Sequence, residues 1–226
     1  MPLALAVLVS GSGSNLQSMI DRIEAGTLDA RISIVLSNNP EAFGLERARR
    51  HGIPTRAVAH QDYPSREAFD AVLVDAIREA GADTVALAGF MRMLTPEFLQ
   101  AFPERILNIH PALLPSFPGT HGQRDAASYG VRLSGCTVHF VNEVMDNGPV
   151  IIQAAVPAQQ DDVAGTLGQR ILALEHRIYP QALQWLSRGR LSIVGRQVFL
   201  APDSTSSPLS RRDGAWLVNP PLEEGF

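Results

Sequence analysis

The stretch LALAVLVSGSGSNLQ, residues 3–17, decides the fold of this 226-residue chain. Its first seven residues are an apolar run that predicts a strand, and the run leads directly into a glycine-rich turn. Residues 15–25 then carry apolar side chains at helical spacing and stop at Gly26. A strand, a tight turn and a helix in this order predict the start of a doubly wound α/β fold.

The same alternation continues along the chain, which predicts a mostly parallel sheet with helices on both faces. Further strands are predicted by short runs rich in β-branched and apolar residues, at 31–36, 55–59, 84–88, 105–110, 135–141 and 150–156. Further helices are predicted by helical periodicity, at 42–51, 65–80 and 95–102.

The last part of the chain has a different character. A long helix is predicted over 163–187, interrupted at Tyr179-Pro180 because proline lacks the N–H that a helix interior needs. Residues 191–200 predict a two-stranded excursion that turns at Gly195-Arg196. The remainder is rich in serine and proline and is expected to be loop-like, so we expect one domain over 1–200 and a peripheral tail over 201–226.

Composition excludes several classes of function. The net charge of -4 argues against nucleic acid as the main partner, since phosphate binding favours an excess of basic residues. All 19 basic residues are arginine, which excludes a Schiff-base lysine and a Walker lysine. The single Cys136 cannot form an internal disulfide, and the apolar start is too short to span a bilayer. We therefore expect a cytoplasmic protein that does not bind membranes.

The glycine turn SGSGSN, residues 10–15, indicates an anion site. Glycines let the backbone approach a ligand, and the amides at the start of the following helix attract phosphate. A dinucleotide site is less well supported, because Leu16 stands where a third glycine is expected and no acidic residue follows the second strand. A plain strand-to-helix turn without a ligand remains the alternative.

Asn108 and His110 form a second candidate site at the end of a predicted strand. Two residues apart, their side chains leave on one face, and together they suit formyl or acyl transfer through a tetrahedral intermediate. Asp146, in the turn-forming DNGP of residues 146–149, would favour the protonated imidazole if it lay nearby. The alternative is that His110 is merely a satisfied polar residue. His139, in an apolar run, is expected to be a core residue that orients the site.

Other site chemistries are poorly supported. No histidine pair has the spacing or carboxylate company of a zinc site, so no metal is expected. A Ser-His-Asp hydrolase is disfavoured because the serines of residues 10–14 lack the frame of a nucleophile elbow.

Several motifs together resemble the phosphoribosylglycinamide formyltransferases of purine synthesis. They are SGSGSNLQ at 10–17, AFGLERA at 42–48, LAGFMR at 87–92, NIHPALLP at 108–115, HFV at 139–141 and DNGPV at 146–150. The resemblance runs from about residue 4 to residue 192. It implies a Rossmann-like fold and transfer of the formyl group of 10-formyltetrahydrofolate to the amine of glycinamide ribonucleotide (GAR), without a covalent enzyme intermediate.

The resemblance also implies roles for individual residues. Asn108, His110 and Asp146 match the catalytic trio, and His139 would support it. On the ribonucleotide side, Gly13, Ser14 and Asn15 would hold the phosphate and Glu175 the ribose or amine. Contacts to the folate would come from Arg66, Met91, Arg92, Met93, Leu94, Asn108, Glu143, Val144 and Met145. The N-terminal half would bind the phosphate and the C-terminal half the folate, in a monomer or a homodimer with no partner beyond these small molecules.

For some of these residues an ordinary structural role competes with function. Arg66 stands in the first turn of a helix and could be solvated, while Glu175 could pair with a neighbouring arginine on a helix surface. Met91 and Met93 could fill core space.

Competing functions follow from the same chemistry. A formyltetrahydrofolate hydrolase would use water in place of the amine and would not need the phosphate turn. An enzyme that formylates tRNA would need a basic RNA-binding extension. A non-catalytic nucleotide-binding module would keep the glycine turn without needing the trio.

Overall fold

The computed structural model describes residues 2–202 and 217–226, which fall into two compact units. The first unit is formed by the chain up to Asn108 together with Phe140–Glu143. The second is formed by Ile109–His139 and by the chain from Val144 onward. The boundary lies inside strand β5 (Ile106–His110), between Asn108 and Ile109.

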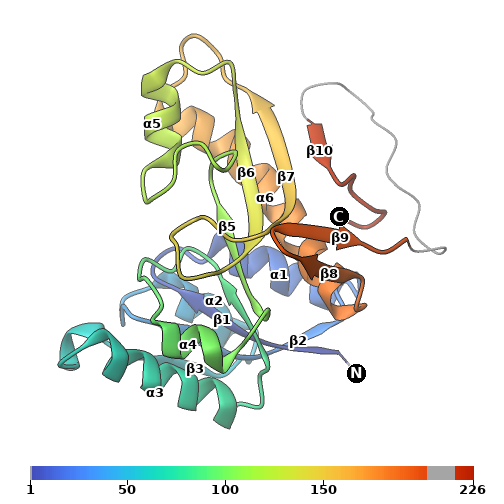
Figure 1. The fold of residues 1–226 in the computed structure, drawn as a ribbon. Coiled ribbons are helices and arrows are strands. Elements are labelled where there is room, and N and C mark those ends of the chain that lie inside the picture. Colours follow the sequence, from blue (N-terminus) through green and yellow to red (C-terminus); the bar gives the residue numbers. More distant parts are fainter. Residues whose placement is uncertain (1, 203–216) are drawn as a thin grey trace. The chain divides into compact units, whose positions relative to one another are not determined.

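The first unit is built on a parallel sheet in the strand order β5-β4-β1-β2-β3 (Figure 1). Its strands are β1 (Leu3–Val9), β2 (Ala30–Ser37), β3 (Thr55–Ala57), β4 (Thr84–Leu87) and the first part of β5. The central strand β1 is almost entirely buried, as expected for a strand covered on both faces. The chain leaves β1 for β2 on one side and reaches β4 on the other, which makes the fold doubly wound.

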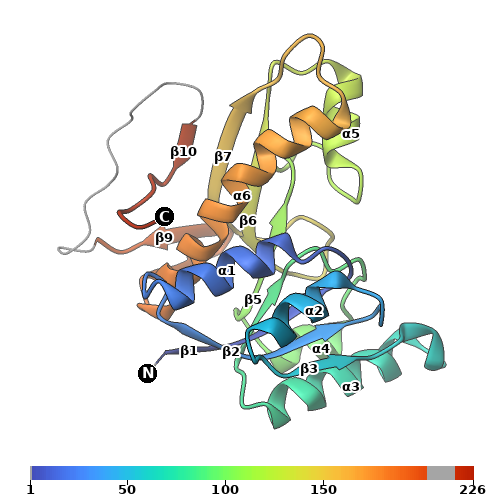
Figure 2. The same ribbon diagram turned by 180° about the vertical axis from the view of Figure 1, so that it is seen from behind.

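Helices cover both faces of this sheet (Figure 2). Helices α1 (Ser14–Glu24) and α2 (Phe43–Arg50) lie on one face, and α3 (Arg66–Glu79) and α4 (Pro96–Ala101) lie on the other. The short 3-10 turn η1 (His60–Asp62) precedes α3. Strand residues such as Leu8 and Leu36 share one buried core with Phe69, Leu73 and Ile77 of α3.

The second unit is built on antiparallel strands and one long helix. Strand β7 (Val150–Pro157) pairs with β6 (Leu133–Phe140) on one side and with β10 (Leu217–Asn219) on the other. Helix α6 (Ala164–Ser187) packs against β7, and α5 (Gly122–Tyr129) packs against α6. Strands β8 (Leu191–Val194) and β9 (Gln197–Leu200) form an antiparallel hairpin. The fold is therefore α/β, with a mostly parallel sheet, flanking helices and a small hairpin near the C-terminus.

Most of the predicted elements are confirmed. The predicted strands, the helices of the first unit and the β8–β9 excursion are all present, with ends within two residues of those expected. The prediction that the long helix is interrupted is wrong, because α6 runs through Pro180 as one helix. Helix α5 was not predicted. None of the helices in the described parts of the chain is both long enough and apolar enough to cross a membrane.

The C-terminal tail is not wholly loop-like. Strand β10 extends the pairing of β7, and Phe226 at the end of the chain is buried. The prediction of a loop is wrong for these residues, because the free edge of β7 and an apolar surface are available to them. The serine-rich stretch 204–208 lies outside the described residues. A domain boundary at residue 200 stays a prediction.

Candidate active site

Strand β5 carries Asn108 and His110 to the end of the sheet. Its apolar residues Ile106, Leu107 and Ile109 are buried, which fixes the strand on both faces. His110 is 4% exposed and Asn108 is half-buried. Because strand side chains alternate, both polar groups leave the strand on the same face.

His110 makes a polar contact at each ring nitrogen within the second unit. Nε2 lies 2.8 Å from the carbonyl oxygen of Phe117, and a carbonyl only accepts, so Nε2 carries a proton in this geometry. Nδ1 lies 3.4 Å from Oδ2 of Asp146. The two side chains are 4% and 11% exposed, so water screens their interaction only weakly.

Asp146 brings further groups into the same cluster. Its Oδ2 accepts the backbone N–H of Gly119 at 2.7 Å, and its Oδ1 lies 3.9 Å from Nε2 of His139. His139 is 2% exposed in the apolar strand β6. The second unit therefore gathers two buried imidazoles and a backbone amide around one carboxylate.

The turn that presents Asp146 is conformationally unusual. Asp146 has a φ of 51°, in the left-handed region that non-glycine residues rarely adopt. The next residue closes the turn, with the N–H of Asn147 donating to the carbonyl of Val144 at 3.2 Å. Holding a non-glycine residue in this conformation costs about 1 kcal/mol or more, so surrounding contacts must stabilise the turn.

The loop after β5 is fixed by a buried hydroxyl that the sequence did not point to. Thr137 of β6 donates from Oγ1 to the carbonyl of Ala112 at 2.7 Å and accepts the N–H of Leu114 at 3.1 Å. The side chain of Gln153 donates to the same hydroxyl and to the carbonyl of Leu114. No motif marks Thr137 or Gln153, because each looks like an ordinary strand residue.

In the first unit, the glycine turn has the geometry of an anion site. Gly13 caps helix α1 with a φ of 67° and, being glycine, offers no side chain to cap it. A Cβ at Gly13 would lie 2.6 Å from the Cα of Gly44, so only glycine fits. Gly44 N–H donates to the carbonyl of Gly11, and Arg47 Nε donates to the carbonyl of Ser12 at 2.8 Å. Contacts from Gly44 and Arg47 thus hold the turn in place. The N-terminus of α1, which is the positive end of the helix dipole, can attract an anion.

Ser14 and Asn15 begin helix α1, directly after the capping glycine. Asn15 is buried, whereas Ser14 is half-buried. Their backbone amides therefore belong to the first turn of the helix, where an anion would bind.

Glu175 lies buried in α6, at 5% exposure, so the alternative that it pairs with an arginine on a helix surface is wrong. Burial raises the pKa of the Cys136 thiol well above its usual range, and the negative charge of Glu175 raises it further.

The predicted folate-side residues are mostly accessible. Arg66 is the first residue of α3 and is exposed, and Arg92 is half-buried. Met91 and Met93 are 60% and 43% exposed, so the alternative that they fill the core is wrong. Leu94 packs against the core of the first unit.

The residues that precede Asp146 are also accessible. Glu143 is exposed in the first unit, and Val144 and Met145 are 57% and 48% exposed in the second. Exposed apolar side chains of this size are available to contact a ligand. Among the described residues, no group of three or more histidine, cysteine or acidic side chains could hold a metal ion.

Comparison with known proteins identifies the family. A model of the family described as formyl transferase matches residues 3–183. Phosphoribosylglycinamide formyltransferase of Escherichia coli is 44% identical over 189 residues, which cover 84% of this chain and 89% of that protein. The trifunctional purine biosynthetic protein adenosine-3 of Drosophila melanogaster is 47% identical over 82% of this chain, but this chain spans only 14% of its length.

Solved structures agree with the sequence relatives. Glycinamide ribonucleotide transformylase 1 of Symbiobacterium toebii is 49% identical, with a TM-score of 0.88, and the match covers 89% of this chain and 95% of that one. A formyltetrahydrofolate deformylase of Pseudomonas syringae has a similar TM-score of 0.83 but is only 25% identical. Since both the His110 and Asp146 cluster and the glycine turn lie within the matched residues, this chain belongs to the formyl transferase family, among its phosphoribosylglycinamide formyltransferases.

Proposed function

We propose that this protein transfers the formyl group of 10-formyltetrahydrofolate to the amine of glycinamide ribonucleotide, in purine biosynthesis. The observation that carries the proposal is the buried contact between Nδ1 of His110 and Oδ2 of Asp146, in a chain of this family. Imidazole and carboxylate together can hold and move the proton that the attacking amine loses and the leaving folate nitrogen gains.

The reaction needs one group that stabilises negative charge and one that handles a proton. The amine nitrogen attacks the formyl carbon, the carbonyl oxygen becomes an oxyanion, and the bond from carbon to the folate nitrogen then breaks. A hydrogen bond from Asn108 and one from His110 would stabilise the oxyanion, each in the position of an oxyanion-hole donor. Asp146 would hold His110 as a donor while a proton passes from the attacking nitrogen to the leaving nitrogen.

The contact between His110 and Phe117 bears on this mechanism. Nε2–H is engaged by the carbonyl of Phe117, so it must be released before that proton can face an oxyanion. Phe117 has a φ of 52°, in the left-handed region, and belongs to the loop between β5 and α5. We infer that this loop changes conformation when substrates bind.

The ribonucleotide phosphate is assigned to the turn of Gly13, Ser14 and Asn15. The αL conformation of Gly13 and the dipole of α1 support this assignment. Glu175 is assigned to the ribose or amine of the same substrate. For the folate we assign the accessible residues Arg66, Met91, Met93, Val144 and Met145, along with Arg92, Leu94 and Glu143.

A single assay separates this function from the alternatives. The protein is incubated with 10-formyltetrahydrofolate, with and without the ribonucleotide, and deformylated folate is followed. We expect turnover only when the ribonucleotide is present. Equal turnover without it would favour a hydrolase, and no turnover in either mixture would favour a non-catalytic module.

Variants at the pair test the mechanism directly. Asp146→Asn keeps an oxygen that can accept the N–H of Gly119 but removes the charge beside His110, so kcat should fall by about 10²-fold or more. In His110→Ala, kcat should fall by at least the same factor. Asp75→Asn, an exposed substitution on α3, is the matched control and should keep the wild-type kcat. Unchanged transfer by His110→Ala would rule out the proposed mechanism.

A further inference from the structure

The β8–β9 hairpin lies beyond the residues 3–183 that match the family model. Its two strands are joined by Gly195 and Arg196, and Gly195 has a φ of 60°. A positive φ at the first turn position is what a tight two-residue hairpin turn requires. Arg196 therefore stands at the tip of the hairpin, in the second unit.

This tip is hydrogen-bonded to the turn that carries Asp146. Nη2 of Arg196 donates to Oδ1 of Asn147 at 2.6 Å. A guanidinium donor makes this a charge-assisted hydrogen bond, which is stronger than one between neutral groups. The backbone N–H of Asn147 donates to Val144 within the turn. Asn147 is thus tied to the turn through its backbone and to the hairpin through its side chain.

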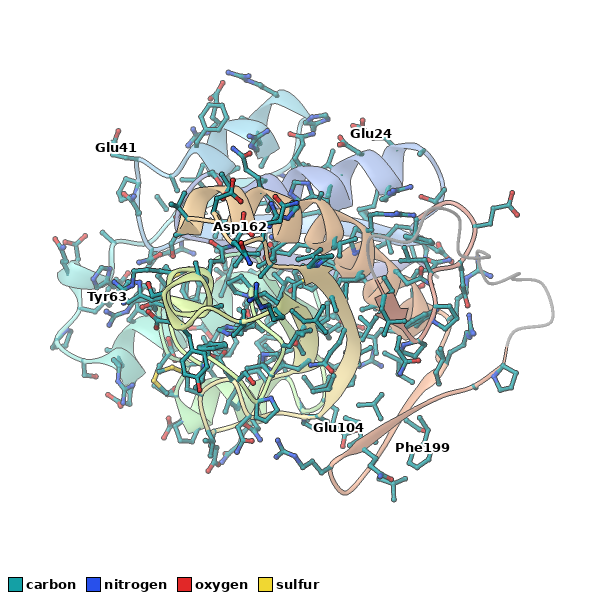
Figure 3. The ribbon with its side chains drawn as sticks, turned by 90° about the horizontal axis from the view of Figure 1, so that it is seen from above. Glu24, Glu41, Tyr63, Glu104, Asp162 and Phe199 are labelled. Carbon is teal, nitrogen blue, oxygen red and sulfur yellow. The ribbon has the colours of Figure 1, made fainter. Side chains whose placement is uncertain are left out.

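The hairpin also packs beside the other end of the same turn. Val150, the first residue of β7, lines one surface pocket together with residues 196–199 of the hairpin. Phe199, one of these hairpin residues, extends from β9 (Figure 3). Only Gly148 and Pro149 separate Val150 from Asn147, so the hairpin contacts the chain on both sides of this short segment.

We propose that Arg196 is a positioning residue for Asp146. Asp146 adopts a left-handed conformation, which aspartate tolerates better than most residues but still at a cost, so contacts from outside help to keep the turn in place. The hydrogen bond from Arg196 supplies one such contact at the adjacent residue. By holding the turn, the hairpin keeps Oδ2 of Asp146 directed at Nδ1 of His110 and at the N–H of Gly119. The effect on catalysis rests on the proposed formyl transfer.

Steady-state kinetics of the full chain test the proposal. Arg196→Ala should lower kcat about two- to fivefold, since the charge-assisted hydrogen bond that it removes is exposed to solvent, while KM for both substrates stays within about twofold. Asn147→Ala should have a similar effect, and the double variant should be no worse than either single variant. Arg196→Lys should restore part of kcat. Arg188→Ala removes the same charge from an exposed position after α6 and should keep wild-type kcat.

Two kinetic outcomes would overturn the proposal. If the effects of Arg196→Ala and Asn147→Ala multiply, Arg196 does not act through Asn147. If KM rises while kcat is unchanged, Arg196 contacts a substrate and does not position Asp146.

Hydrogen exchange provides a readout that does not depend on activity. The amide of Gly119 is protected by its bond to Asp146, so its exchange should become faster in Arg196→Ala and stay unchanged in Arg188→Ala. Unchanged exchange in Arg196→Ala would contradict the positioning role even if the wild-type protein transferred no formyl group. Failure of the proposed function would instead appear as an inactive wild type with the exchange effect intact.

Discussion

At the scale of single residues, Thr137 shows how a buried hydroxyl shapes the loop next to His110. It makes hydrogen bonds with Ala112, Leu114 and Gln153. We predict that Thr137→Val lowers the free energy of unfolding by about 1–3 kcal/mol, since the isosteric side chain leaves the buried N–H of Leu114 without its acceptor. Urea denaturation measures the change. Thr137→Ser keeps the hydroxyl and should lose clearly less, whereas a larger loss in Thr137→Ser than in Thr137→Val would show that methyl packing dominates.

Cys136 illustrates how burial can make a thiol unreactive. The thiol is completely buried, and burial followed by the charge of Glu175 raises its pKa well above the usual range. Because the thiolate is the reactive form, we predict that a thiol-specific disulfide reagent will not label the native protein at pH 8 in the time that labels the urea-denatured protein fully.

Glu175→Gln is the informative control for Cys136. It removes the charge but keeps the burial, so labelling of the native protein should remain undetectable. Rapid labelling of the native wild type would contradict the buried position of Cys136.

At the scale of helices and strands, Asp70 links α3 to α4. Its Oδ2 accepts the N–H of Thr95 at 2.7 Å, and Thr95 Oγ1 accepts the N–H of Phe98 to cap α4. Asp70 is 1% exposed, and this burial raises the pKa of its carboxyl, although the hydrogen bonds from Thr95 oppose the shift. The folded protein therefore favours the protonated carboxyl more than the unfolded chain does.

The sign of this shift fixes a pH dependence. Stability from Asp70 is fully present below the unfolded pKa, near pH 4, and is lost as the pH rises through the higher folded pKa. We predict that the free energy of unfolding of wild type, relative to Asp70→Asn, falls as the pH rises above about 4. Denaturant unfolding across this range measures it. For Asp75→Asn, on the exposed face of α3, the difference in unfolding free energy from wild type should vary less with pH. A difference between wild type and Asp70→Asn that does not vary with pH would contradict the prediction.

The elements that could be predicted are those whose own sequence determines them. Helices α1 and α3 have apolar side chains at helical spacing and end near Gly26 and Gly81, so their limits can be read from the chain. Helix α5 has few apolar residues, of which Ala126 is buried, and it depends on packing against α6. Helix α6 continues through the buried Pro180 because its packing outweighs a local cost of about 3 kcal/mol.

In the candidate site, too, some contacts could be predicted from the sequence and others could not. The pairing of His110 with Asp146 was predicted from a strand end and a turn, and the structure places them 3.4 Å apart. The carbonyl of Phe117 and the amide of Gly119 could not be predicted, because backbone groups carry no sequence signal. Their positions depend on the conformation of the whole loop between β5 and α5.

At the scale of the whole molecule, the chain divides inside β5. The glycine turn belongs to the first unit, whereas His110, Asp146, the loop after β5 and the β8–β9 hairpin belong to the second. The pair that carries the proposed chemistry is therefore held by contacts within one unit. Those contacts come from segments far apart in sequence, including the part of the chain beyond the family match.

The last ten residues also contribute to the second unit, and their packing can be tested. Glu223 N–H donates to Oε1 of Gln181, and its carboxylate pairs with Arg190 at 2.7 Å. Leu222, next to these contacts, is 2% exposed, whereas Leu217 is 49% exposed. We predict that Leu222→Ala lowers the free energy of unfolding by about 2–4 kcal/mol, through lost burial and a cavity.

Leu217→Ala is the matched control for Leu222→Ala, since it removes the same atoms from a half-exposed position in β10. It should change the free energy of unfolding by no more than about 1 kcal/mol. Urea denaturation of both variants decides between two descriptions of this segment. If Leu222→Ala lowers the free energy of unfolding no more than Leu217→Ala does, residues 217–226 lie on the surface of the second unit and contribute little to its stability. If it costs clearly more, they are part of its core, and β10 pairs with β7 because Leu222 and Phe226 anchor the segment that follows it.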